Sequence, residues 1–189
     1  MATYTLQEIA SIISPNSGVK LHFPDRIIKD FVIDTRRISS ANEALFFALA
    51  GKGRHGNSFI PAAYQAGIRA FVVDQNHAFE IFDDADYLIC ENPLQELQNI
   101  AAQHRKKFNY PVIAITGSNG KTIVKEWLYQ LLNNTFNIIR SPKSYNSQIG
   151  VALSILEMKQ EHQLAIIEAG IDQKNEMPRL EEIIKPNIG

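Results

Sequence analysis

Hydrophobic positions along the first half of the chain alternate between strand-like runs and helix-like stripes. Thr5 and Glu8 form a capping-box pattern before an apolar stripe, which marks a helix start, and Gly67 marks the end of another helix. The elements predicted here are, in order, a helix over 6–13, strands over 27–33 and 44–49, a helix over 59–66 and a strand over 68–73.

The second half of the chain continues this alternation. Asn92 and Pro93 have the N-cap and first-turn chemistry of a helix start, so we place a domain boundary near residue 91. The elements predicted after it are a helix from Pro93, strands over 111–116, 136–139 and 164–167, and helices over 123–132, 149–156 and 177–184. Strands that alternate with helices predict an α/β fold with a parallel sheet, divided into domains 1–90 and 91–189.

Several side chains with reactive or aromatic groups are expected to be structural. Trp127 lies in the apolar stripe of the helix over 123–132 and is expected in the core, and Cys90 ends an apolar strand and is expected to be a buried hydrophobe. His104 continues a helical apolar stripe, so we expect it to pack inside the protein. Three histidines in polar segments are expected at the surface: His22, His77 and His162.

The sharpest chemical signal is a glycine-rich loop between an apolar strand and an amphipathic helix. Its residues are Gly117, Ser118, Asn119, Gly120, Lys121 and Thr122. Backbone N–H groups at such a helix start can cradle phosphates, Lys121 can reach the terminal phosphates, and the Thr122 hydroxyl can ligate Mg²⁺. The general phosphate-loop pattern has a glycine where this chain has Ile115, so the match is partial. The alternative is a structural turn that happens to contain a lysine.

Two polar residues farther along the chain are candidates for the same site. Glu168 ends an apolar strand, and an acid at the carboxyl end of a parallel strand beside a phosphate loop can hold Mg²⁺. The alternative is an ordinary carboxylate that faces solvent. Asn146 precedes an apolar helix, where it either contacts a ligand or caps the helix.

Composition and charge narrow the class of protein. Of the 189 residues, 45% are hydrophobic, and 19 basic against 20 acidic residues give a net charge of −1, which argues against a nucleic-acid partner. The single cysteine excludes an internal disulfide and fits a reducing compartment. The N-terminus lacks the features of a signal peptide, and the longest apolar run, over 44–50, is too short to cross a bilayer. We therefore expect a cytoplasmic protein with no membrane partner.

The loop sequence over 116–122, Thr-Gly-Ser-Asn-Gly-Lys-Thr, resembles that of the Mur ligases, ATP-dependent enzymes that form amide bonds in bacterial cell-wall synthesis. Further segments similar to this family's motifs are Asp34-Thr-Arg-Arg37, Ala44–Gly51, Asn146-Ser-Gln-Ile-Gly150 and Ile166–Gly170. The resemblance covers about residues 25–189. It is strongest to the ligase that joins D-alanyl-D-alanine to a UDP-N-acetylmuramoyl-tripeptide, including the form fused to an alanine racemase.

The resemblance implies a fold and a reaction. The fold is an N-terminal UDP-substrate-binding α/β domain followed by a truncated P-loop parallel-sheet ATPase domain. In the reaction, ATP phosphorylates the carboxylate of the UDP-linked peptide, and the amine of D-alanyl-D-alanine attacks the acyl phosphate. Lys121 would neutralise the γ-phosphate, and Thr122 and Glu168 would hold Mg²⁺. The residues assigned to the UDP substrate are Thr35, Arg36, Gly51, Arg54, His55, Gly56, Asn57, Asn146, Ser147 and Gln148.

The chain departs from the family pattern at a few positions. His55-Gly-Asn57 stands where the family usually has Asp-Gly-His, and Lys143-Ser144 stands where it has Gly-Asn. The guanidinium of Arg36 suits a pyrophosphate, but the alternative is a surface ion pair with Asp34.

The last residues, Lys185–Gly189, have the pattern of a strand that is just starting. We therefore expect a fragment of a longer protein, inactive alone and prone to self-association through an unpaired sheet edge; the alternative is a frayed terminus. Two other functions stay open. One is a different ligase of the superfamily, which adds the third peptide residue or resembles folylpolyglutamate synthase, and the other is a non-catalytic nucleotide-binding module.

Overall fold

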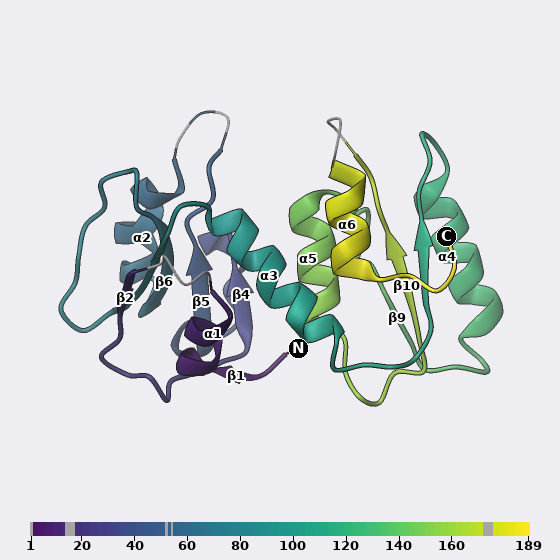
Figure 1. The fold of residues 1–189 in the computed structure, drawn as a ribbon, viewed down its shortest axis with the longest axis horizontal. Coiled ribbons are helices and arrows are strands. Elements are labelled where there is room, and N and C mark those ends of the chain that lie inside the picture. Colours follow the sequence, from purple (N-terminus) through teal and green to yellow (C-terminus); the bar gives the residue numbers. More distant parts are fainter. Residues whose placement is uncertain (1, 14–17, 52, 54, 172–175) are drawn as a thin grey trace. The chain divides into compact units, whose positions relative to one another are not determined.

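The structure, a computed structural model, describes residues 2–13, 18–51, 53, 55–171 and 176–189 (Figure 1). Contacts within the chain divide it into two compact units, which we call the N-terminal unit (residues 2–100) and the C-terminal unit (residues 101–189). The division falls inside helix α3 (Pro93–Arg105), the helix that was predicted to open the second domain. No helix in the described ranges has both the length and the apolar character that a bilayer crossing requires.

The N-terminal unit contains a five-stranded sheet with strand order β2-β7-β6-β5-β4. Its strands are β2 (Gly18–Lys20), β4 (Asp30–Val32), β5 (Ala44–Phe47), β6 (Ala70–Asp74) and β7 (Asp86–Cys90). Strands β4 to β7 are parallel to one another, whereas β2 pairs antiparallel with β7. A separate antiparallel pair joins β1 (Tyr4–Thr5) to β3 (Ile27–Ile28). The α/β prediction is confirmed, with an antiparallel edge strand that the sequence pattern did not reveal.

Local sequence signals set the helices of this unit. Helix α1 (Leu6–Ile12) begins at the predicted capping box: the Glu8 N–H donates to the Thr5 hydroxyl at 3.1 Å, and the Thr5 N–H donates to the Glu8 carboxylate at 2.6 Å. Helix α2 (Ile60–Gln65) is followed by Gly67, whose φ of +97° is a left-handed conformation that glycine tolerates. The short 3-10 turns are η1 (Thr35–Arg37), η2 (Ala41–Glu43) and η3 (Gly56–Phe59).

The core of the N-terminal unit is apolar and aromatic. Its buried members include Val32, Phe46, Ile60, Ile68, Phe71 and Tyr87. Cys90 is also buried, and this burial raises the pKa of its thiol to about 12. The prediction that Cys90 is a buried hydrophobe rather than a nucleophile is therefore confirmed.

The C-terminal unit contains a three-stranded parallel sheet with strand order β8-β10-β9. Its elements are strands β8 (Val112–Ile115), β9 (Ile138–Arg140) and β10 (Leu164–Glu168), and helices α4 (Lys121–Leu132), α5 (Gln148–Leu156) and α6 (Glu176–Ile184). Helices α5 and α6 lie on one face of this sheet, and α4 lies on the other (Figure 1). Beside β8, Ile188 forms a parallel bridge with Ile113, in agreement with the strand-like pattern at the end of the chain.

The apolar stripe of α4 has a buried part and an exposed part. Leu128, Tyr129 and Leu132 pack against the apolar core of the sheet. Trp127 is 64% exposed and Leu131 is 75% exposed, so the prediction that Trp127 belongs to the core is wrong. The reason is that helical spacing shows which residues share a stripe, but not which part of a wide stripe meets the sheet.

The last turn of α3 is tied to the C-terminal unit by buried polar groups. His104 is 4% exposed, and its Nε2 lies 3.0 Å from the carbonyl oxygen of Met158. Burial lowers the pKa of His104 to about 4. Arg105 donates to the carbonyl oxygens of Phe108, Ile184 and Lys185. The expectation that His104 packs inside the protein is confirmed.

Candidate functional site

The glycine-rich loop joins the end of β8 to the start of α4, as the sequence predicted. Gly117 has a φ of +137° and Gly120 a φ of +79°, both in the region that side chains with a Cβ disfavour. Gly120 is the N-cap of α4 and has no side chain to accept the first N–H groups of the helix. The positive end of α4 and its first backbone donors therefore lie at the loop, which is the arrangement that binds anions.

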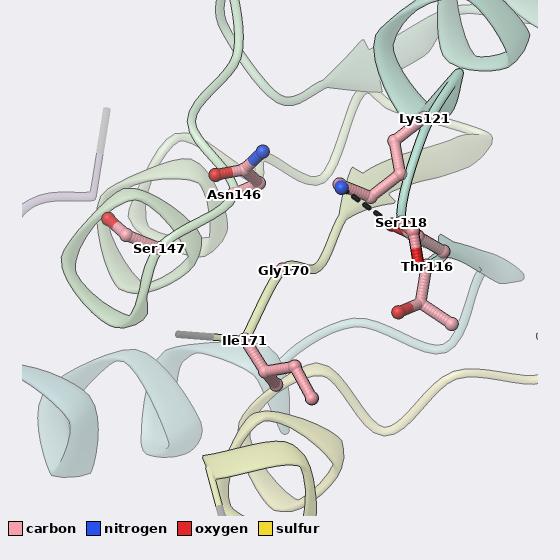
Figure 2. Close-up of a pocket in the computed structure, with 8 residues that line it drawn as sticks. Thr116, Ser118, Lys121, Asn146, Ser147, Gly170 and Ile171 are labelled. Atoms are coloured by element: carbon pink, nitrogen blue, oxygen red, sulfur yellow. Dashed lines mark hydrogen bonds between the residues drawn. The ribbon is translucent and has the colours of Figure 1, made fainter. Parts of the chain in front are cut away.

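A cavity of about 310 Å³ opens at this loop (Figure 2). It is lined by Thr116, Gly117, Ser118, Lys121, Asn146, Ser147, Gly170 and Ile171. The Lys121 Nζ donates to the Gly117 carbonyl oxygen at 2.6 Å, so the ammonium group lies over the loop backbone and faces the cavity. Three segments that are distant in sequence thus meet here: the loop, the start of α5 and the residues after β10.

A buried carboxylate lies next to the loop. Glu168, the last residue of β10, is 1% exposed, and its two oxygens lie 3.0 and 2.9 Å from the Thr122 hydroxyl. The Asn146 side-chain amide donates to the same carboxylate at 2.9 Å. The interpretation of Glu168 as a carboxylate that faces solvent is therefore wrong. A hydroxyl and a carboxylate side by side are oxygen donors of the type that Mg²⁺ prefers.

Lys125 is a part of this site that sequence reasoning missed. Its side chain is fully buried, its Nζ lies 3.6 Å from Glu168 Oε2, and it donates to the carbonyl oxygens of Ser141 at 2.9 Å and of Lys143. The Ser141 hydroxyl in turn accepts the backbone N–H of Glu168 at 3.0 Å. Lys125 therefore holds the carboxylate and the turn after β9 together.

A signal for Lys125 was present in the sequence. It lies four residues after Lys121, so both lysines project from neighbouring turns of one helix face. Lys121 remains partly exposed at the cavity, whereas Lys125 is enclosed. Burial alone would raise the pKa of the adjacent Glu126, but hydrogen bonds from Lys125 and Arg140 lower it, so this acid stays ionised.

Asn146, in the polar run before α5, was predicted either to contact a ligand or to cap the helix. Ser147, not Asn146, is the N-cap of α5, and its hydroxyl accepts the Gly150 N–H at 3.2 Å. The suggestion that Asn146 caps the helix is therefore wrong, because its amide points to Glu168 instead. The Gln148 side chain donates to Glu176 at 2.7 Å, on the neighbouring helix α6.

The remaining residues predicted to bind the UDP substrate lie in the N-terminal unit. Thr35 and Arg36 belong to turn η1, and the Arg36 guanidinium forms an ion pair with Asp34 at 2.7 Å while 86% of its side chain is exposed. The hydrogen bonds to Asp34, and then its negative charge, raise the pKa of Arg36. The alternative role foreseen for Arg36 is thus present, and the exposed guanidinium is still accessible to a ligand.

The loop that was predicted to contact the same substrate is partly described. Arg54 lies outside the described residues, and Gly51 is exposed. Gly56 is buried, and a Cβ at this position would lie 2.1 Å from the Ala48 backbone. Asn57 is 2% exposed, and its amide nitrogen donates to the carbonyl oxygens of Asp74, the last residue of β6, and of His77, so it fixes the loop. His55 caps turn η3 and contacts Asp74.

Comparison with known protein families identifies the family of this chain. The pattern of the Mur ligase family, catalytic domain, matches residues 28–133, and that of the Mur ligase middle domain matches residues 115–189. The chain belongs to the Mur ligase family. The phosphate loop with Lys121 and the buried Glu168 at the end of β10 both lie within the matched segments.

Individual Mur ligases show how much of such an enzyme the chain represents. The UDP-N-acetylmuramoyl-tripeptide–D-alanyl-D-alanine ligase of Synechocystis sp. is 37% identical over 162 residues, which cover 86% of this chain and 35% of that enzyme. The ligase of the same name from Buchnera aphidicola is 35% identical over 188 residues, which cover all of this chain and 39% of that enzyme. The chain therefore spans between 35% and 39% of the length of these two relatives.

Solved Mur ligase structures have the same fold. MurF from Acinetobacter baumannii superposes with a TM-score of 0.86 at 26% identity, over 98% of this chain and 40% of that one. MurF from Thermotoga maritima, solved in complex with ADP, superposes with a TM-score of 0.72 at 26% identity, over 84% of this chain and 36% of that one. The predicted α/β fold and the resemblance to Mur ligases are both confirmed.

Proposed function

We propose that this chain is the part of an ATP-dependent ligase that binds the UDP-linked substrate and the phosphates of ATP. The reaction is the joining of D-alanyl-D-alanine to UDP-N-acetylmuramoyl-tripeptide through an acyl phosphate, in peptidoglycan synthesis in the cytoplasm. The observation that carries the proposal is the loop of the C-terminal unit, where Lys121 faces a cavity beside the buried Thr122–Glu168 pair. The names of the relatives, and their identity over most of this chain, support the substrates.

The C-terminal unit supplies the phosphate chemistry. The backbone N–H groups over 117–122 would hold the β-phosphate, and the Lys121 ammonium would neutralise the charge that develops on the γ-phosphoryl group during transfer. The Thr122 hydroxyl and the Glu168 carboxylate fit Mg²⁺, since both are oxygen donors and lie within 3.0 Å of each other. When bound, Mg²⁺ would supply further charge neutralisation on the phosphates.

The substrate carboxylate must meet the γ-phosphate, which limits where the peptide end can bind. Asn146 and Ser147 line the cavity beside Lys121, so we assign them, with Gln148, to the peptide end of the UDP substrate. Residues of the N-terminal unit would bind its nucleotide end: Thr35, Arg36, Gly51, Arg54, His55, Gly56 and Asn57. Domains 1–90 and 91–189 thus correspond to substrate binding and ATP binding.

The proposal is tested in a ligase of family length that carries these 189 residues as its N-terminal part. We expect Lys121→Ala to abolish ligation while the free energy of unfolding falls by about 1 kcal/mol or less, because this ammonium acts on the phosphates and not on the core. Lys106→Ala, which removes an exposed lysine in the turn after α3, is the matched control and should leave activity unchanged. A Lys121→Ala activity within about tenfold of wild type, or about 1.4 kcal/mol in the barrier, would show that Lys121 is not the phosphate lysine.

The same enzyme separates the proposal from its alternatives. Turnover with D-alanyl-D-alanine as the acceptor, but with no single amino acid, glutamate included, would exclude the other ligases of the superfamily. Any turnover would exclude a non-catalytic module. That the isolated 189-residue chain self-associates stays a prediction, which sedimentation velocity can check.

A further inference from the structure

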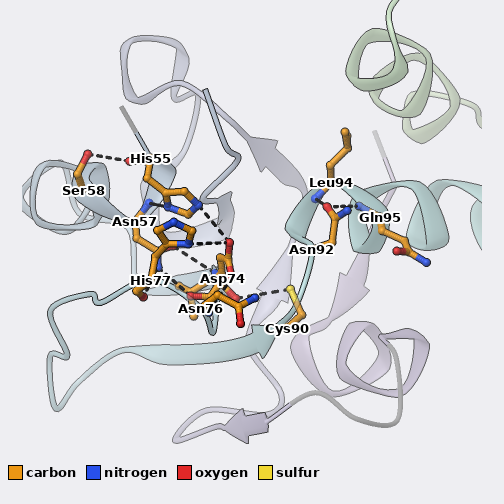
Figure 3. Close-up of polar contacts among 11 residues, drawn as sticks. His55, Asn57, Ser58, Asp74, Asn76, His77, Cys90, Asn92, Leu94 and Gln95 are labelled. Atoms are coloured by element: carbon orange, nitrogen blue, oxygen red, sulfur yellow. Dashed lines mark hydrogen bonds and ion pairs between the residues drawn. The ribbon is translucent and has the colours of Figure 1, made fainter. Parts of the chain in front are cut away.

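A cluster of two histidines and one aspartate lies in the N-terminal unit, outside the phosphate site. His55 precedes turn η3, Asp74 ends strand β6, and His77 lies in the turn that follows (Figure 3). The His55 Nε2 and the His77 Nδ1 each lie 3.1 Å from the same atom, Asp74 Oδ2. His77 was predicted at the surface, and its side chain is 52% exposed, so this prediction is confirmed.

The backbone that carries this cluster is rigidly held. The Asn57 side-chain amide donates to the carbonyl oxygens of Asp74 at 2.9 Å and of His77 at 2.7 Å. The second carboxylate oxygen of Asp74 accepts the Asn76 N–H at 2.8 Å. The two imidazole rings stack with centroids 3.7 Å apart and an interplanar angle of 11°. All three ligand-capable groups are therefore preorganised, and the exposed edge of His77 leaves one side open.

We propose that His55, Asp74 and His77 bind a divalent transition-metal ion of the Zn²⁺ class, with water in the remaining coordination position. Their ligand atoms all lie within 4.8 Å of one another. Zn²⁺ with bonds of about 2.0–2.2 Å separates tetrahedral ligand atoms by about 3.3–3.6 Å, so small side-chain shifts from the 3.1 Å contacts accommodate the ion. Two imidazoles with one carboxylate select such ions over Mg²⁺ and Ca²⁺.

The competing arrangement is a metal-free one in which both imidazoles donate a hydrogen bond to Asp74. The His55 Nδ1 accepts the Asn57 N–H at 3.3 Å, which places the imidazole proton on Nε2. Metal binding at Nε2 moves that proton to Nδ1 and breaks the long bond from Asn57, and it moves the His77 proton from Nδ1 to Nε2. The two arrangements therefore differ in whether the backbone N–H of Asn57 is hydrogen-bonded, which its amide resonance reports.

The test uses the untagged 189-residue chain, stripped with a chelator and titrated with Zn²⁺ by calorimetry and with Co²⁺ by visible absorption. We expect one ion per chain, a tetrahedral Co²⁺ spectrum and a shift of the Asn57 amide resonance. His77→Gln should weaken binding more than about tenfold, and His55→Gln should do the same. His22→Gln, which replaces an exposed histidine of the same unit, is the matched control.

Circular dichroism shows whether each variant is folded, and His77→Gln is the decisive variant because half of its side chain is at the surface. Binding that is equal in His77→Gln and His22→Gln would overturn the proposal, as would no binding by the folded wild-type chain. Neither result bears on the phosphate site, since the cluster contains none of its residues.

Discussion

Replacement of Lys125 by methionine tests whether the phosphate site is held together by one buried ammonium group. Methionine has nearly the length of lysine and fills the same space, but it removes the ammonium group that lies 3.6 Å from the Glu168 carboxylate and leaves two carbonyl oxygens without this donor. Glu168 itself is 1% exposed, so water has little access to solvate its carboxylate once the ammonium group is gone.

The expected loss of stability follows from this burial. Removal of one partner of a buried ion pair destabilises proteins by about 3–5 kcal/mol, because the remaining charge is left uncompensated. The same change at Lys121, one turn earlier, removes a partly exposed group with a single 2.6 Å hydrogen bond and should destabilise by about 1 kcal/mol or less. The two lysines of one helix face are thus predicted to separate into a structural and a functional residue.

Hydrogen exchange at the backbone amides of β10 and α5 measures this difference, since it reports the free energy of opening of the C-terminal unit by itself. In Lys125→Met combined with Glu168→Gln, the uncompensated charge is gone, so the double variant should lose about 1–3 kcal/mol less than the sum of the single variants. A Lys125→Met chain within about 1 kcal/mol of wild type, or strict additivity in the double variant, would refute the reasoning.

Three further predictions concern Arg36, His104 and Lys143. Arg36→Ala should weaken binding of the UDP substrate about tenfold or more and leave ATP affinity unchanged, and calorimetry that finds equal losses for both ligands would contradict the role of Arg36. Burial lowers the pKa of His104 to about 4, so the unfolded state takes up a proton at a higher pH than the folded state does. The free energy of unfolding should therefore fall as pH drops from about 6.5 to about 4, by at most about 3 kcal/mol. His104→Gln should flatten this part of the pH profile of the free energy of unfolding, measured with urea. Lys143 has a φ of +50°, a left-handed conformation that glycine adopts without strain, so Lys143→Gly should stabilise the chain by about 1 kcal/mol. A decrease in the unfolding temperature would contradict this prediction.

Much of the fold could be predicted because local chemistry decides it. The capping box at Thr5, the helix start at Asn92 and the glycine turn at Gly117 are short-range signals, and each is found where the sequence placed it. Strand β2 and the exposed side of Trp127 could not be predicted in the same way, because pairing and burial depend on residues far along the chain.

The candidate site likewise contains residues that local sequence patterns predict and residues that they do not. Lys121, Thr122 and Glu168 could be predicted because a phosphate loop and a strand-end acid are local patterns. The spacing of Lys125 from Lys121 is visible in the sequence, but its burial is not, since a lysine on an amphipathic helix is usually at the surface and Lys125 is enclosed only when the turn after β9 closes over it. The His55–Asp74 contact joins residues of different elements, and nothing near either residue announces it.

The central claim, phosphoryl transfer to the substrate carboxylate at the Lys121 loop, is tested most directly by isotope transfer. In a ligase of family length that carries these residues, the peptide carboxylate of UDP-N-acetylmuramoyl-tripeptide is labelled with ¹⁸O, and inorganic phosphate is analysed by mass spectrometry after ligation with ATP and D-alanyl-D-alanine. An acyl phosphate breaks its carbon–oxygen bond when the amine attacks, so each phosphate released should contain one labelled oxygen, and Lys121→Ala should release none. Ligation that yields unlabelled phosphate would contradict the account.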